Sequence, residues 1–336
     1  MRDESDETVR IRVPRRGVRS PLARAMPVVV AAGLVGLGAS GAAWWLWSAD
    51  PAVEPSAFVA PAPSVDKPAV ISPDGAERAA AAPPMADEAQ ILDDAPAQLA
   101  IYRFAPRPAV VVLQFPSLAE QALMLNRVAA LVEKSGFPRN DVVSREALDA
   151  QIRADGGSPD TFYYGHDYRS ADLVRFFDLA SDLNPDEQRL RDMVQRFGWR
   201  GPGAAGAVIS LVRASSEKGL DAAGRAAILR HELSHGIYFT DPAYAEFCRR
   251  FWHDTLSAEE RDKFTAFLGR EGYDTSLADL LVNETQAYLM HTPDRRYFSA
   301  AEVGLSPTRV VELRQIFVVG MPAGWLRDHT AVDRPP

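Results

Sequence analysis

The stretch "AAGRAAILRHELSHGIYF", Ala222 to Phe239, is the segment from which the fold and the candidate site are best predicted. Asp221 precedes it and is a suitable N-cap, so we expect the stretch to form one helix. His231 and His235 then lie four residues apart, and their imidazoles project from one helix face about one turn apart. Two imidazoles in this arrangement can share one metal ion.

Zinc suits this pair because it accepts neutral imidazole nitrogens in a tetrahedral shell and can keep one position for water. Glu232 directly follows His231 and is rotated around the helix by about 100 degrees. We therefore expect its carboxylate beside the attacking water, as a general base, rather than on the metal. The alternative interpretation is a helix whose two histidines are merely solvated or hydrogen-bonded.

Two histidines and a water leave zinc one protein ligand short. Gly236 follows His235 directly and the next histidine is His253, which excludes the pattern HExxHxxGxxH. A glutamate on a later helix is the remaining choice, and "LLVNETQAYLMH", Leu280 to His291, offers Glu284 in an apolar helical context. Other glutamates stand in ordinary amphipathic surroundings, namely Glu246, Glu259, Glu260 and Glu271.

These two segments resemble the zincin metallopeptidases, and among them the gluzincins, whose signature is HExxH followed downstream by NExxA or NExxS. The matching residues are His231–His235 and Asn283–Ala287, so the resemblance covers only these two helices. It implies that His231, His235 and Glu284 bind one zinc ion per chain. It also implies that Glu232 is the base and proton shuttle.

Two features depart from thermolysin-like enzymes. The gap from His235 to Glu284 is longer and is closer to the lethal-factor-like branch, in which further helices intervene. Tyr288 stands where those enzymes carry an aspartate. The carboxylate that orients a ligand imidazole is therefore expected elsewhere, at Asp241 or Asp279.

Tyr288 lies one turn beyond Glu284 on the same helix face. Its hydroxyl is expected to stabilise the oxyanion of a tetrahedral intermediate, and the alternative is a core tyrosine whose hydroxyl is hydrogen-bonded. Weaker candidates, each with a structural alternative, are Tyr238, His166 and His291. The histidines expected at the surface are His253 and His329.

The rest of the domain, residues 99–330, is predicted to be α+β, mostly helical and zincin-like, because a small set of strands precedes a run of helices. The expected strands are Ala109–Phe115 and Gly206–Ala214, with "TFYYGHDY", Thr161–Tyr168, as a strand or sheet edge. The expected helices begin at or after caps: Ser117 to 135, Ser144 to Gly156, Ser170–Leu183, a helix from Pro185, Asp221–Phe239, Ala243–Phe251, Ser257–Arg270, Ser276–His291 and Pro307–Val318.

The N-terminal part of the chain has the pattern of a membrane anchor. Residues 1–24 contain seven arginines, whereas residues 25–48 contain no charge and end in a tryptophan cluster. An apolar run of about 20 residues can cross a bilayer, and tryptophans favour its interface. The pattern predicts a single-pass anchor in a bacterial-type inner membrane, with the basic tail cytoplasmic and the domain periplasmic or extracellular. A cleaved signal peptide is the alternative.

Composition narrows the remaining possibilities. Residues 49–98 are rich in Ala and Pro and are expected to form a disordered, flexible linker. A net charge of -8 argues against nucleic acid as the main partner. Cys248 is the single cysteine and is expected to be a buried apolar residue rather than a catalytic thiol.

The sequence therefore predicts a membrane-anchored, zinc-dependent metallopeptidase that hydrolyses peptide bonds in the cell envelope. An exposed sheet edge is expected to hold an extended protein or peptide substrate by strand addition. Two alternatives remain open: an inactive zincin-like scaffold or binding protein, and an amidase acting on cell-wall peptides. The oligomeric state does not follow from the sequence.

Overall fold

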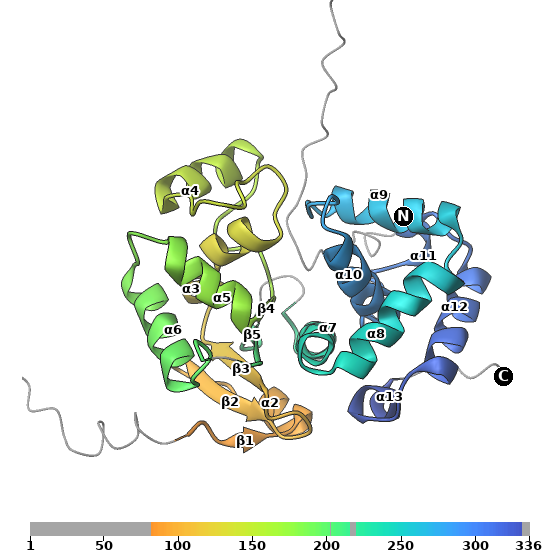
Figure 1. The fold of residues 1–336 in the computed structure, drawn as a ribbon, viewed down its shortest axis with the longest axis horizontal. Coiled ribbons are helices and arrows are strands. Elements are labelled where there is room, and N and C mark those ends of the chain that lie inside the picture. Colours follow the sequence, from red (N-terminus) through yellow and green to blue (C-terminus); the bar gives the residue numbers. More distant parts are fainter. Residues whose placement is uncertain (1–81, 202, 216–219, 331–336) are drawn as a thin grey trace, which may run out of the picture. The chain divides into compact units, whose positions relative to one another are not determined.

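The computed structural model describes residues 82–201, 203–215 and 220–330 (Figure 1). The strands are β1 Met85–Ala86, β2 Ala100–Phe104, β3 Val110–Phe115, β4 His166–Arg169 and β5 Ala207–Val212. The helices are α2 Glu88–Asp93, α3 Leu118–Val132, α4 Arg145–Ala154, α5 Ser170–Leu179, α6 Pro185–Arg196, α7 Ala222–Thr240, α8 Pro242–Arg250, the π-helix Phe251–Thr255, α9 Ala258–Arg270, α10 Ala278–His291, α11 Ala300–Val303, α12 Pro307–Gly320 and α13 Trp325–His329.

The described strands form one mixed sheet in the order β1-β2-β3-β5-β4. The parallel pair β3 and β5 forms its centre, with Val110 opposite Ala207 and Phe115 opposite Val212. Every residue of both strands is buried, because α3 packs on one face of the pair and α7 on the other. β4 pairs antiparallel with β5 and forms the edge of the sheet next to α7.

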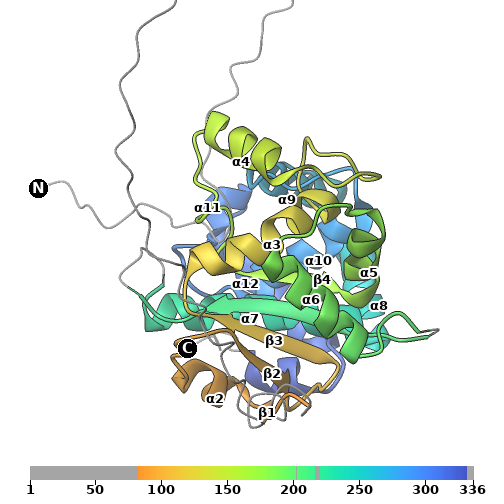
Figure 2. The ribbon, with the colours of Figure 1, turned by 90° about the vertical axis from the view of Figure 1, so that its left-hand side faces the viewer.

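The helix α7 packs unusually close to the sheet. A side chain at Gly236 would place its Cβ 2.7 Å from Val110 and 3.3 Å from Ile209, so only glycine permits this approach. On its other side α7 contacts α10 and α8. Figure 1 shows α7 between a group formed by α3 to α6 and a group formed by α8 to α13, and Figure 2 shows α3, α5 and α6 near the strands. The expected helix at this position is confirmed.

Most caps read from the sequence are present in the structure, but α10 begins at Ala278 after an uncapped Leu277 rather than at Ser276. The side chains of Ser117, Ser144 and Asp221 each accept a hydrogen bond from a backbone N–H in the first helical turn. Complete capping boxes form at Asn184 and Ser257. Each cap satisfies amide groups that a helix leaves unpaired at its start, which explains why these boundaries were predictable.

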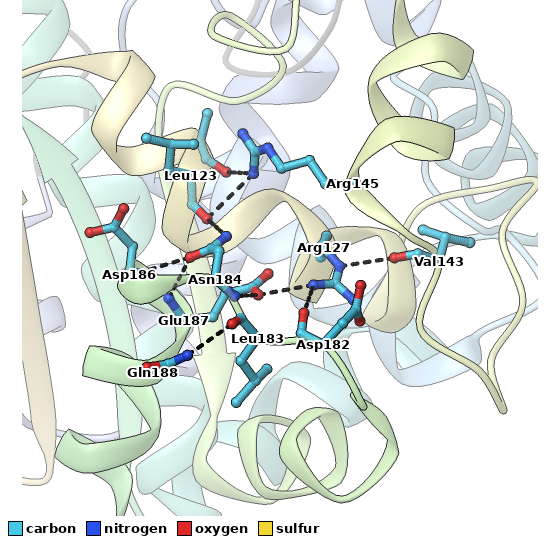
Figure 3. Close-up of polar contacts among 11 residues, drawn as sticks. Leu123, Arg127, Val143, Arg145, Asp182, Leu183, Asn184, Asp186, Glu187 and Gln188 are labelled. Atoms are coloured by element: carbon cyan, nitrogen blue, oxygen red, sulfur yellow. Dashed lines mark hydrogen bonds and ion pairs between the residues drawn. The ribbon is translucent and has the colours of Figure 1, made fainter.

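A buried ion pair connects α3 to α6 (Figure 3). The Arg127 guanidinium donates to the Glu187 carboxylate at 2.9 Å, and both side chains are almost completely buried. It also donates to Asp182 Oδ1 at 2.6 Å and to the Val143 carbonyl oxygen at 2.9 Å. Burial raises the pKa of Glu187, an effect that the Asn184 backbone and Arg127 partly offset. One arginine thus holds a helix and two loops together.

The folded part begins before the expected boundary at residue 99. β1 and α2 lie inside the range 49–98 that composition assigned to a linker. Arg225 of α7 donates to the carbonyl oxygens of Ile91 and Asp94 at 2.9 and 3.0 Å, and Arg230 pairs with Glu88. These contacts with α7 stabilise α2 in its place, although the composition of this short segment alone does not predict a stable helix.

The predicted fold class needs one correction. The domain is α+β with a small mixed sheet, as expected, but among the described residues no helix is long and apolar enough to cross a membrane. The longest, α7, carries two arginines, two histidines and a glutamate, whereas a spanning helix needs about 20 apolar residues. The transmembrane part of the predicted architecture, and the inner-membrane localisation based on it, therefore find no support among the described helices. The ranges 1–24 and 25–48 themselves lie outside the described residues.

Candidate metal centre

Three side chains from two helices converge beneath the sheet edge. His231 and His235 of α7 have their Nε2 atoms 3.0 Å apart. Glu284 of α10 places Oε2 3.9 Å from the first and 3.7 Å from the second of these nitrogens. All three side chains are fully buried. The helix expected around Asn283 therefore brings its glutamate to the histidine pair, 49 residues after His235 along the chain.

The donor set and spacing fit zinc. In a tetrahedral site with zinc–nitrogen bonds of about 2.0–2.1 Å, two ligand atoms lie about 3.4 Å apart. The three observed separations lie on both sides of that value, so small side-chain rotations would bring the atoms onto one ion. Among the described residues, several groups of side chains could hold a metal ion, and Glu284 belongs to two of them. None of these groups contains the other glutamates considered from the sequence, Glu246, Glu259, Glu260 and Glu271.

Glu232 lies next to this triad but offers its carboxylate from a different direction. Its side chain is fully buried and groups with His235 and Asp167 of β4, with potential ligand atoms within 4.8 Å of one another. A Cβ at Gly165 would overlap the Glu232 carboxylate, so the chain just before β4 must be glycine to admit it. Glu232 is thus held between α7 and the sheet edge, beside the three candidate ligands.

The outer nitrogens of both imidazoles face polar groups. His231 Nδ1 lies 2.8 Å from the hydroxyl oxygen of Thr292, and His235 Nδ1 lies 3.8 Å from Asp167 Oδ1. The two aspartates expected in this role serve elsewhere: Asp241 caps α8, and Asp279 accepts a hydrogen bond from Tyr238 at 2.7 Å. Helix periodicity could not reveal the true neighbours, because β4 and the residue after α10 reach the site only through the tertiary fold.

A fourth carboxyl group approaches the site from the end of α3. Glu133 is buried and groups with Asp167 and Glu284 within 4.8 Å. Together with Glu232, four buried carboxyl groups surround the two histidines. Carboxylate oxygens beside imidazole nitrogens are donor atoms of the kind that bind a divalent metal ion, so the composition of the site suits such an ion. The segment "VEKSG" that contains Glu133 carries no sequence signal for such a role.

Tyr288 packs against the first histidine. Its ring lies edge-on to His231 with centroids 4.8 Å apart and edge-on to Phe267 at 5.0 Å. Its position beside the candidate ligands agrees with the expectation from helix spacing. The weaker candidates have structural partners: Tyr238 donates to Asp279, His166 contacts Tyr168 at 2.7 Å, and His291 contacts Tyr244 at 3.0 Å.

The expected exposure of two histidines and the expected burial of the cysteine are confirmed. His253 and His329 are exposed. Cys248 is buried, and burial raises the pKa of its thiol, which keeps it protonated near neutral pH.

His291 belongs to a buried network behind the site. Tyr244 donates its hydroxyl hydrogen to Gln286 at 2.7 Å, so its oxygen accepts from His291 Nε2 at 3.0 Å. Gln286 in turn donates to Ser234 at 3.1 Å, and Ser234 donates to the His231 carbonyl oxygen. Burial, and to a lesser degree the charge of Arg230, lowers the pKa of His291 to about 3. Burial thus keeps the imidazole neutral, with its hydrogen on Nε2 for the hydrogen bond to Tyr244.

We expect His291 to make the stability of the metal-free chain depend on pH. Between pH 6.5 and pH 3 the unfolded chain binds a proton on this histidine that the folded chain does not bind, so stability falls as the pH falls through this window. One such group contributes up to about 1.4 kcal/mol per pH unit. Urea unfolding at several pH values gives the free energy of unfolding as a function of pH. This free energy should change less with pH in His291→Leu than in wild type. In Tyr244→Phe, which keeps the histidine, it should change with pH as in wild type. The same pH dependence of the free energy of unfolding in wild type and in His291→Leu would contradict this prediction.

The chain matches no protein-family model, and no curated protein and no solved structure is detectably similar to it. The functional argument therefore depends on the residues and geometry of the site itself.

Proposed function

We propose that the protein is a zinc-dependent metallopeptidase, similar in its site to the gluzincins. The observation that carries this proposal is the convergence of His231, His235 and Glu284 on one buried point with Glu232 beside them. Two imidazoles and one carboxylate are the protein ligands of one common type of catalytic zinc site, which leaves a position for water. The HExxH spacing alone supports a metal site, and the carboxylate from α10 adds the third ligand.

Each side chain has a distinct task in the proposed reaction. His231, His235 and Glu284 would hold zinc, which as a Lewis acid polarises a peptide carbonyl and makes water more acidic. Glu232 accepts the proton of the attacking water and passes it to the leaving amine. The Tyr288 hydroxyl donates a hydrogen bond to the developing oxyanion, a role supported by the position of Tyr288 beside His231.

The proposed substrate is an extended segment of a protein or peptide. β4 is the edge strand nearest α7 and carries Asp167 into the site, so it is the strand on which an added substrate strand would lie. The internal strand β5, which precedes α7 in sequence, is already paired on both sides. Since the four central side chains are fully buried, a covering segment must move before a peptide can reach them.

Metal analysis of the purified full chain tests the zinc site. We expect one zinc ion per wild-type chain. We expect Glu284→Ala to weaken zinc binding by more than the roughly 10- to 100-fold loss that removal of an outer-shell partner causes. Glu246→Ala, on the exposed surface of α8, is the matched control and should bind zinc like wild type.

Two results would count against these assignments. A wild-type chain that binds no zinc removes the basis of the peptidase proposal. A Glu284→Ala variant with unchanged affinity shows that another group completes the metal shell.

A further inference from the structure

Both candidate ligand imidazoles point their Nε2 atoms toward the centre of the candidate site. Their Nε2 atoms face each other at 3.0 Å, and their Nδ1 atoms point outward to groups on other elements. A neutral imidazole carries its hydrogen on one nitrogen and can bind a metal only through the other. The partner of each outer nitrogen therefore decides whether the inner nitrogen is available.

Thr292 determines the tautomer of His231. Its hydroxyl oxygen lies 2.8 Å from His231 Nδ1 and 2.9 Å from the Ala287 carbonyl oxygen. A hydroxyl has a single hydrogen, and a carbonyl oxygen only accepts, so that hydrogen is directed to Ala287. The Thr292 oxygen must then accept a hydrogen bond from His231 Nδ1. In its neutral form His231 therefore carries its hydrogen on Nδ1 and leaves the lone pair of Nε2 free for a metal.

Asp167 faces the outer nitrogen of His235. Its Oδ1 lies 3.8 Å from His235 Nδ1, which is beyond hydrogen-bond distance, and both side chains are buried. Because Nε2 of His231 carries a lone pair, the 3.0 Å contact places the hydrogen of neutral His235 on Nε2 in the metal-free chain. A metal bound at Nε2 of His235 would displace that hydrogen, and the neutral ring would then carry its hydrogen on Nδ1, where the Asp167 carboxylate can accept it.

We propose that Thr292 and Asp167 are positioning residues: Thr292 fixes His231 as the Nδ1–H tautomer before metal binds, and Asp167 accepts the Nδ1 hydrogen of His235 once Nε2 of that ring is a ligand. Thr292 follows α10 directly and Asp167 lies in the edge strand β4, so neither belongs to the helix that carries the histidines. The sheet edge and the end of α10 thus preorganise the metal site. The inference rests on the proposed zinc site, and its test separates the two.

The experiment measures zinc affinity of the full chain by competition with a chromophoric chelator. Thr292→Val and Asp167→Ala should each bind zinc about 10- to 100-fold more weakly than wild type. Thr292→Ser keeps the hydroxyl and should restore wild-type affinity, and Asp167→Asn keeps an acceptor and should lose less than Asp167→Ala. Thr285→Val removes another buried hydroxyl of α10 and should leave affinity unchanged. Thermal unfolding of each metal-free variant checks that it is folded.

Nitrogen-15 NMR of labelled histidines in the metal-free chain gives a second readout. Wild type should show His231 with hydrogen on Nδ1, and Thr292→Val should shift His231 toward the Nε2–H form that free imidazole side chains prefer. If wild type binds zinc and both Thr292→Val and Asp167→Ala bind it equally well, the positioning roles are wrong although the zinc site stands. If wild type binds no zinc, the proposed function fails. The NMR spectrum of the metal-free chain then decides the role of Thr292: hydrogen on Nδ1 of His231 supports it, and hydrogen on Nε2 overturns it.

Discussion

Replacing Glu232 with glutamine is expected to abolish peptide cleavage while the chain still binds zinc. The substitution keeps the shape of the side chain and its place between α7 and Gly165. It removes the only function that the proposed mechanism assigns to this residue, which is to accept and return a proton. General acid–base catalysis contributes about 10²- to 10⁴-fold to the rate of an enzyme, and we expect a loss in that range. Zinc affinity should stay close to that of wild type, because Glu232 lies outside the ligand triad.

The measurement compares cleavage of a denatured protein and of a peptide library by metal-loaded wild type and Glu232→Gln. Glu246→Gln makes the same chemical change on the exposed face of α8 and should keep full activity. A Glu232→Gln variant that contains zinc and cleaves at the wild-type rate would show that the base is another group. A zinc-containing wild type that cleaves neither substrate would instead favour the scaffold interpretation of the domain.

The candidate metal ligands could be picked out from the sequence because the patterns that mark them are local. The four-residue spacing of His231 and His235 follows from helix geometry, and Glu284 stands in a segment whose apolar pattern predicts a buried helix. The helix α7 and the central strands were predictable for the same reason, since caps and apolar runs are properties of neighbouring residues.

The rest of the site depends on contacts between distant segments. Asp167 lies in "YYGHDYRS", where the sequence drew attention to His166. Alternation along the strand places these two neighbours on opposite faces, and of the two only Asp167 groups with the candidate metal ligands. Thr292 and Glu133 follow the ends of α10 and α3, where no periodic pattern extends. Strand β2 was missed because most of its residues are only half-buried, so it lacks the continuous apolar run of a central strand. Helix α2 was missed because arginines of α7 hold it in place, and such contacts cannot be read from its own sequence.

The second large effect is on stability, and it concerns Arg127. Replacing it with leucine should destabilise the domain by about 3–5 kcal/mol, because the buried carboxylate of Glu187 loses its cation. The loops around Asp182 and Val143 also lose a donor. Arg145 offers a matched control in the same region: its hydrogen bonds to Ala122 and Leu123 are long, at 3.3 and 3.4 Å, so Arg145→Leu should cost far less (Figure 3).

Urea unfolding distinguishes the loss of a charge partner from the loss of packing. If the cost of Arg127→Leu comes from the isolated Glu187 carboxylate, the double variant Arg127→Leu with Glu187→Leu should regain much of the lost stability, since removing both partners of a buried pair is often close to neutral. The same origin predicts that the gap between wild type and Arg127→Leu narrows as the pH falls toward 4. Burial already raises the pKa of Glu187, and without Arg127 its pKa rises further, so in the folded variant the group becomes neutral before it does in wild type. A gap that is independent of pH, together with a double variant no more stable than the single one, would assign the effect to packing of the arginine side chain.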